Sequence, residues 1–163
     1  MRLHTPHPHT PAAFGRSHII GRVRTYITQA TLASLALLAI LLIEQGVSDG
    51  IIVVTIVSST ATVFVVPRSI ASSPKRVIGG HVGSVLVGLA LRGGLRLVTG
   101  AAVVGLSVLV MATTNTEHAP AAGTAFGIIV VGLSFTFTAF ILSAAVILSI
   151  VRYVLLDRLQ YLL

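Results

Sequence analysis

Cysteine and tryptophan are absent from this 163-residue chain, and acidic residues number only four. The missing cysteine excludes disulfide bonds, thiolate metal ligands and a cysteine nucleophile. Charged residues make up 9% of the chain and hydrophobic residues 55%, whereas about a quarter of a soluble domain is charged. Such a chain has too few charged residues to form the surface of a soluble protein. The composition therefore indicates an integral membrane protein and leaves no room for a separate catalytic domain.

Acidic residues are outnumbered by eleven Lys and Arg residues, which gives a net charge of +7. In a soluble protein this excess would suggest a nucleic-acid partner. Here the basic residues stand singly or in pairs between apolar runs, so orientation in the bilayer explains them better. We expect membrane lipids as partners and no nucleic acid.

The uncharged intervals predict an all-α fold, a polytopic bundle of transmembrane helices. A helix needs about 20 apolar residues to cross a bilayer, so the chain has room for about five spans plus a short broken or re-entrant half-helix. The expected spans are residues 25–43, 50–66, 77–91, 95–113 and 134–155, with the half-helix at 120–131. Together they form one transmembrane domain, residues 25–158, followed by a short C-terminal end, residues 159–163.

Residues 1–24 have the composition of a disordered basic tail, with four arginines, no acid and three prolines. Four histidines in this tail raise the hypothesis of a metal site. Their spacing among the prolines forms no regular face, so we favour disorder and expect no bound metal. These histidines are His4, His7, His9 and His18.

The longest uncharged interval, residues 118–151, does not fit one span. As a single helix its 34 residues would be about 51 Å long, and each half alone is too short to cross. We prefer a half-helix starting near Pro120, a break at residues 132–134 and a full span to Arg152. Irregular backbone at membrane depth is tolerated only where protein or a water-filled cavity shields it, so a break points to function. One long helix that protrudes into water stays the alternative.

The distribution of positive charge predicts a cytoplasmic N-terminus, and we expect the protein in the cell (inner) membrane. The tail and the loop at residues 67–76 carry seven positive charges, and the opposite loops carry Arg92 and Arg96 beside Glu44 and Asp49. The side of the C-terminus stays open. Five spans would leave Arg152 and Arg158 outside, whereas a broken segment that crosses twice would return them to the cytoplasm.

The densest polar cluster follows the fourth expected span, at residues 113–120. Pro120 suits the first turn of a helix, so the N–H groups of residues 121–123 would point back toward His118. A helix N-terminus carries partial positive charge and free donors, which suits a small anion. Broken helices in transporters use their N-termini in this way. Glu117 would repel an anion unless it is paired or protonated, and an ordinary water-exposed capping loop is an equal alternative.

A second cluster leads into the third expected span. Arg68, Lys75 and Arg76 would concentrate anions at a cytoplasmic mouth, or they anchor the loop to lipid headgroups. His81 follows a Gly-Gly pair, and an ionisable residue within a span is a functional hypothesis by default. An interfacial or packing role for His81 is the alternative.

Enzymatic chemistry finds no support in the sequence. We find no Ser–His–acid set, no metal-ligand set and no phosphate-binding loop. We therefore expect no enzymatic activity and no cofactor.

The two clusters together resemble the HPP family of small integral membrane proteins. One run, residues 67–81, contains Pro67-Arg68 and Gly79-Gly80-His81; the other, residues 114–125, resembles the family's Thr-x-x-x-His-Pro-Pro-Ala-Gly-Ala-Thr-Ala stretch. The signature falls on His118, Pro120, Gly123 and Thr124. The sequence departs from it at Ala119, where the family has its first proline, and at residues 121–123, which stand for a shorter Ala-Gly. The resemblance covers about residues 25–155 and implies a compact helical bundle, with nitrite transport in plastid and cyanobacterial relatives.

Our leading hypothesis is a transporter or channel for a small monovalent anion, with nitrite first. A non-transporting structural or sensory component and a transporter of another solute, including a cation, are the alternatives. A bundle of this size barely encloses a pore, so we expect a homo-oligomer. Because histidine titrates near neutral pH, proton exchange at His118 or His81 during passage is a further hypothesis. The substrate-binding candidates are Arg68, His81, Thr114, Asn115, His118, Pro120, Gly123 and Thr124, and the mouth or gate candidates are Lys75, Arg76, Gly79, Gly80 and Glu117.

Overall fold

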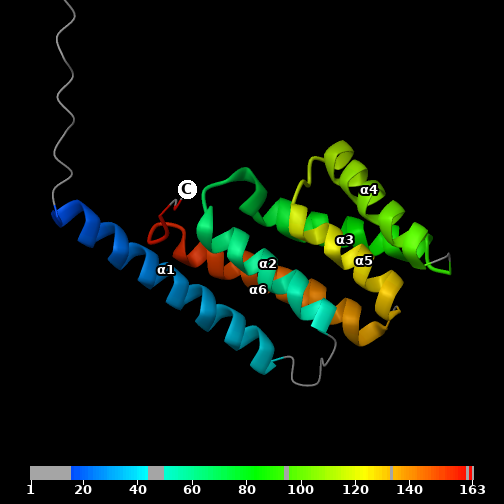
Figure 1. Ribbon diagram of the computed structural model, residues 1–163, viewed down its shortest axis with the longest axis horizontal. Helices are drawn as coiled ribbons and strands as arrows, with labels where there is room; N and C mark the ends of the chain where they lie inside the picture. The colour runs from blue at the N-terminus through cyan, green and yellow to red at the C-terminus, as the bar shows by residue number, and fades with distance from the viewer. Residues whose placement is uncertain (1–15, 44–49, 94–95, 133, 161, 163) are drawn as a thin grey trace, which may run out of the picture.

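The computed structural model describes residues 16–43, 50–93, 96–132, 134–160 and 162. Within these residues the chain is helical, with no strand (Figure 1). This confirms the predicted all-α helical bundle. The elements are α1 (Arg16–Ile43), α2 (Gly50–Val65), η1 (Ile70–Ser72), α3 (Pro74–Ala90), α4 (Arg96–Thr114), η2 (Ala119–Ala121), α5 (Ala122–Val131) and α6 (Phe135–Leu155).

Helix α1 begins nine residues earlier than expected, whereas α2 to α6 begin and end within a few residues of the expected bounds. The prediction of a disordered tail at residues 1–24 is therefore wrong for residues 16–24, which are helical. The last proline of the tail is Pro11, so nothing after it interrupts the backbone hydrogen bonds of a helix. Residues 1–15, with three of the tail histidines, lie outside the described residues, as does the side chain of His18.

The long uncharged interval is broken where expected. Gly132 ends α5 with φ of +98°, a conformation that suits glycine, and its N–H donates to Ile128 O at 3.1 Å. Ser134 caps α6, since its hydroxyl accepts the N–H of Phe137 at 2.9 Å. The alternative of one long helix is wrong, because separate capping interactions end one helix and start the next.

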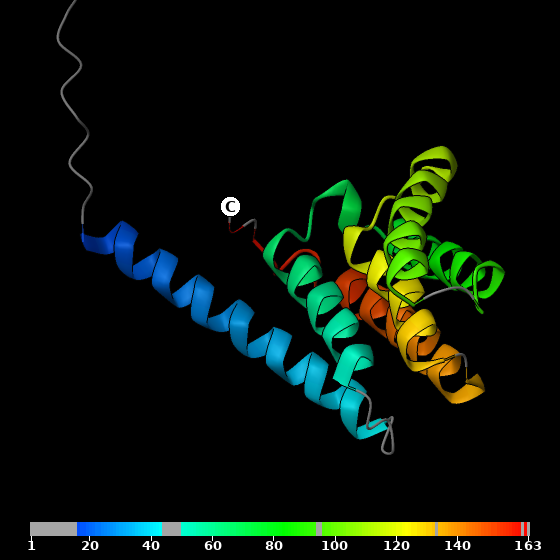
Figure 2. The same ribbon diagram turned by 45° about the vertical axis from the view of Figure 1, so that its right-hand side comes forward.

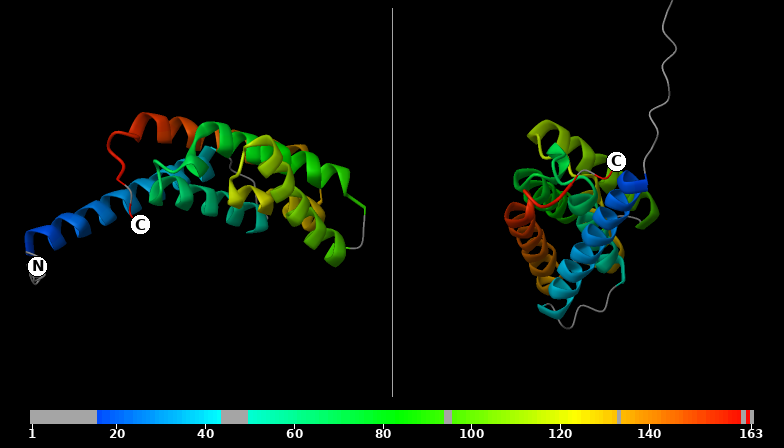
Figure 3. Two further views of the ribbon diagram at one scale, coloured as in Figure 1. Left: turned by 90° about the horizontal axis from the view of Figure 1, so that it is seen from above. Right: turned by 90° about the vertical axis from the view of Figure 1, so that its left-hand side faces the viewer.

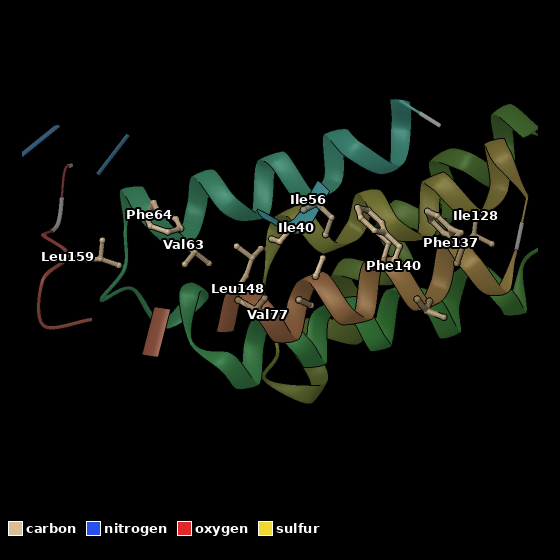
Figure 4. Packing of buried hydrophobic residues seen from close by; sticks show 14 residues of the cluster. Ile40, Ile56, Val63, Phe64, Val77, Ile128, Phe137, Phe140, Leu148 and Leu159 are labelled. Carbon is tan, nitrogen blue, oxygen red and sulfur yellow. The ribbon is translucent and has the colours of Figure 1, made fainter. Parts of the chain in front are cut away.

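The main hydrophobic core surrounds α6. Phe140, Ile141 and Leu148 of α6 are fully buried, and Val63 of α2 and Val77 of α3 reach the same core (Figure 4). Helix α1 lies along α2 at the edge of the bundle (Figures 1 and 2), and its first turns extend past the other helices (Figure 3). Helices α2 and α3 pack against α6, α4 and α5 pack against α3, and α1 and α4 lie at opposite edges of the bundle.

The C-terminal segment folds back onto the end of the bundle where α2 ends. The buried Gln29 side chain of α1 donates from Nε2 to Phe64 O at 2.7 Å and to Gln160 O at 2.8 Å. The N–H of Leu162 donates to Val65 O at 3.1 Å. We name this end, formed by the first half of α1, residues 66–76, residues 115–118, the last turn of α6, residues 156–160 and residue 162, the basic end. Its basic residues whose side chains are described are Arg24, Arg68, Lys75, Arg76, Arg152 and Arg158.

The outer surface of the bundle is apolar. Large hydrophobic side chains such as Ile27 on α1 and Leu109 on α4 are more than half exposed. Two described helical stretches, Val23–Ile40 and Phe135–Leu155, are long and apolar enough to cross a membrane. Three shorter apolar stretches accompany them: Val54–Val65, Val98–Thr114 and Ala119–Val131.

Candidate functional site

Two fully buried histidines meet inside the bundle. His81 lies on α3, and His118 is the residue that caps η2. Their ring centroids are 5.5 Å apart. The structure thus brings together the two histidines that stand in the two separate sequence motifs.

Ser59 of α2 lies between the two imidazoles. Its buried hydroxyl is 3.0 Å from Nε2 of His81 and 3.1 Å from Nε2 of His118. On the far sides, Nδ1 of His81 lies 2.8 Å from the Thr124 hydroxyl on α5, and Nδ1 of His118 lies 2.9 Å from Ala71 O. These five residues form one unbroken hydrogen-bonded network, which we name the histidine network.

The Ala71 carbonyl fixes the direction of every bond in the neutral network. A carbonyl only accepts, so Nδ1 of His118 donates to it, and Nε2 of neutral His118 accepts the Ser59 proton. Ser59 has then used its one proton, so Nε2 of His81 donates to the Ser59 oxygen. Nδ1 of His81 consequently accepts the Thr124 proton. We therefore assign opposite tautomers to the two rings.

Both imidazoles are placed to be neutral. Neither ring is hydrogen-bonded to a carboxylate among the described residues, and a buried charge without a partner is costly. Burial lowers the pKa of His118 below its usual value, against the smaller raising effect of its bond to Ala71 O. The described residues hold no group of three or more side chains suited to bind a metal.

Two glycines of α3 allow the His118 loop to approach. A β-carbon at Gly80 would lie 3.1 Å from the His118 Cβ and 3.2 Å from the Ala121 Cβ. At Gly79 a β-carbon would lie 2.6 Å from Cγ2 of the buried Thr116. Gly79 and Gly80, predicted as gate residues, thus serve as a close-packing surface that holds the loop against α3.

Asn115 shapes the start of this loop. It has φ of +55°, and the N–H groups of Asn115 and Thr116 donate back to Ala112 O and Met111 O in a Schellman arrangement that ends α4. Asparagine tolerates this left-handed conformation better than most residues. Its side chain also accepts a hydrogen bond from Arg76.

Glu117 is paired with Arg76, the two charged atoms lying 2.5 Å apart. The carboxylate is half-exposed and the guanidinium largely covered. The sequence left open whether Glu117 would repel an anion. In the structure the positive charge of Arg76 offsets the negative charge of Glu117, which weakens that repulsion. Arg76 thereby joins α3 to the loop through both Glu117 and Asn115.

The start of α5 differs from the expected anion cradle. Three free N–H groups were expected at residues 121–123. The 3₁₀ turn uses two of them, because Ala121 donates to His118 O and Ala122 to Ala119 O and Pro120 O. The prediction of free N–H donors is therefore wrong for Ala121 and Ala122, because both groups donate within the 3₁₀ turn.

The other predicted site residues lie apart from the histidine network. Arg68 donates to Leu159 O at 2.7 Å and to Leu156 O at 3.3 Å, so it ties down the C-terminal segment. Thr114 bonds Thr116 at 2.7 Å at the end of α4, and Lys75 is exposed. Pro120 lies within η2 and Gly123 packs α5 against Thr55 of α2.

Ser59 and the Ala71 carbonyl were not predicted from the sequence. The signal for Ser59 was present, since residues 58–60 place three hydroxyl side chains in the middle of an apolar span. Nothing in the sequence singles out the carbonyl of an alanine, because any residue would supply it.

Comparison with known proteins agrees with the motifs. The family model for HPP, transmembrane region, matches residues 18–160. No curated protein matches the chain, and no solved structure does. The family match covers both segments that build the histidine network. The chain therefore belongs to the HPP family and is an integral membrane protein.

Proposed function

We propose that the protein carries a small monovalent anion across the membrane, with nitrite as the first candidate. The observation that supports this most is the histidine network itself, two buried imidazoles in a helix bundle at the loop that joins α4 to α5. Ionisable groups inside a membrane bundle commonly mark the path of an ion or a proton.

The charges around the network favour an anion over a cation. No described carboxylate contacts either imidazole, so a network that gains a proton becomes positive. Glu117, the acidic residue that would suit a cation, is already paired with Arg76. Six basic side chains are described at the basic end, against the carboxylates of Glu117 and Asp157, and such an excess raises the local concentration of anions.

Nitrite suits the chemistry of the network. It is a small planar oxyanion that accepts hydrogen bonds, and the network contains imidazole N–H groups and hydroxyls, which could donate to it in place of their present partners. The same charges predict the orientation of the protein in the membrane. We propose that the basic end, where α1 begins and the described C-terminal residues lie, faces the cytoplasm.

Flux into proteoliposomes tests the function. Purified protein is reconstituted and uptake of nitrite, nitrate, formate, chloride and potassium is compared with that of protein-free liposomes. We expect nitrite uptake above the protein-free rate, and a reduction of about tenfold or more in His118→Ala, the size of a lost hydrogen bond to an ion. Thr28→Ala, an exposed hydroxyl on α1, is the control.

The other outcomes separate the alternatives. Uptake of potassium without nitrite would support a cation transporter. No uptake of any ion by well-folded protein would support a structural or sensory component.

A further inference from the structure

We propose that Ser59 joins His81 and His118 into a unit that carries one proton, so that each anion crosses together with one proton. This inference rests on the proposed function and adds the second substrate, H⁺, and the residue that couples it to the anion.

The network is a continuous path for a proton. Its four hydrogen bonds are 2.8, 3.0, 3.1 and 2.9 Å long, from Thr124 through His81, Ser59 and His118 to Ala71 O. Each of the three inner side chains both donates and accepts. A proton can therefore pass between the two imidazoles only through the Ser59 hydroxyl, because the network contains no direct bond between the rings.

The Ala71 carbonyl oxygen only accepts a hydrogen bond, so a proton can enter or leave the network only at its other end, Thr124. A proton that arrives at the Thr124 oxygen displaces the Thr124 proton onto Nδ1 of His81. Nε2 of His81 then gives its proton to Ser59, and Ser59 gives its own to Nε2 of His118. The network gains one proton and one positive charge, held by His118 as an imidazolium that donates to both Ser59 and Ala71.

A second proton has no place in this arrangement. Two imidazoliums with centroids 5.5 Å apart would both donate to the same Ser59 oxygen, and like charges at this distance repel strongly in a buried site. The unit therefore holds one proton at a time.

The nearby charged groups do not neutralise that proton. On the loop after α4, Glu117 is paired with Arg76 of α3. Arg68 and, on α6, Arg152 bond backbone carbonyls, and Lys75 is exposed. The described parts of α2 and α5 carry no acidic or basic side chain. The anion itself is then the counter-charge, which predicts that the pair moves without net charge.

Simultaneous measurement of nitrite and protons tests this inference. Proteoliposomes containing a trapped pH-sensitive dye take up nitrite at mildly alkaline pH, with protein-free vesicles run in parallel because undissociated nitrous acid also crosses lipid. We expect one proton per nitrite after subtraction, no effect of an imposed membrane potential, and accumulation driven by a proton gradient.

Ser59→Ala breaks the path, so we expect it to lose proton-driven accumulation. Nitrite exchange at equal pH on both sides should fall much less. Ser58→Ala, the exposed neighbour on the same helix, should behave as wild type. A second pair of variants distinguishes lost coupling from misfolding at the buried Ser59. Thr124→Val removes the hydroxyl and should uncouple proton movement from nitrite uptake. Thr124→Ser keeps the hydroxyl and should leave the two coupled.

Wild-type nitrite flux without protons, or full coupling in both Ser59→Ala and Thr124→Val, would overturn the inference and leave anion transport standing. Absence of wild-type nitrite flux would overturn the proposed function and this inference together.

Discussion

The imidazole rings of His81 and His118 lie with their centroids 5.5 Å apart and their planes inclined by 58°, close enough for one serine hydroxyl to bond both. Each histidine belongs to one of the two motifs that resemble the HPP family. Because Gly79 and Gly80 let the loop before α5 pack onto α3, the two motifs form one site.

The tautomers of the two rings provide the first prediction. His118 should carry its proton on Nδ1 and His81 on Nε2, since the Ala71 carbonyl fixes the direction of the whole network. Nitrogen NMR of the protein with isotope-labelled histidine, in detergent at mildly alkaline pH, distinguishes the two forms. The same tautomer at both rings would contradict the assigned network.

Stability should fall in mild acid. The pKa of His118 is lowered in the fold from 6.5, so between the lowered value and 6.5 the unfolded chain binds more protons. The free energy of unfolding is therefore highest above pH 6.5 and decreases as the pH falls below it. Melting curves in detergent measure this effect.

In His118→Asn the fall of melting temperature with acid should be smaller, because the group that titrates differently in the two states is gone. An equally steep fall in this variant would show that other groups cause it. The comparison uses slopes, so a general loss of stability in the variant does not disturb it.

Close packing of α3 on α5 depends on Gly88. A β-carbon there would lie 3.0 Å from the Ile128 Cβ and 3.2 Å from the Ala125 Cα, so Gly88→Ala should destabilise the protein by about 1–3 kcal/mol. Gly105 of α4 has no atom within 4 Å of such a β-carbon. Gly105→Ala should therefore be neutral or stabilising by about 0.5–1 kcal/mol. Equal effects in thermal unfolding would refute this difference.

Much of the helical layout was predictable because charges mark helix ends and apolar residues fill the intervals. The break near Gly132 was predictable for the same reason, since no single helix of that length fits a bilayer. The start of α1 was not, because a basic stretch such as residues 16–24 is equally compatible with a tail and with a helix that extends beyond the span.

The histidines of the site were predictable from their types and positions, but their partners were not. Ser59 depends on which face of α2 turns inward, and that is decided by packing. Arg68 was assigned to the anion because it is a basic residue in the loop. Its actual partners, Leu156 O and Leu159 O, depend on the return of the C-terminal segment, which no local pattern reveals.

The return of the C-terminal segment to the basic end predicts on which side of the membrane this segment lies. The absence of cysteine makes single-cysteine labelling with a membrane-impermeant maleimide straightforward. Arg158→Cys and Lys75→Cys should be modified from the same side of sealed vesicles, and Arg92→Cys from the opposite side. Arg158→Cys reacting together with Arg92→Cys would contradict the arrangement of the basic end.

Nitrite uptake by the two histidine variants tests directly whether the histidine network carries the anion. Initial rates are measured side by side for wild type, His81→Ala, His118→Ala and Thr28→Ala, reconstituted at equal amounts and checked for folding by circular dichroism. We predict uptake by wild type and Thr28→Ala, and rates reduced by about tenfold or more in both histidine variants. Folded histidine variants that take up nitrite at the wild-type rate would contradict a role of the histidine network in anion transport.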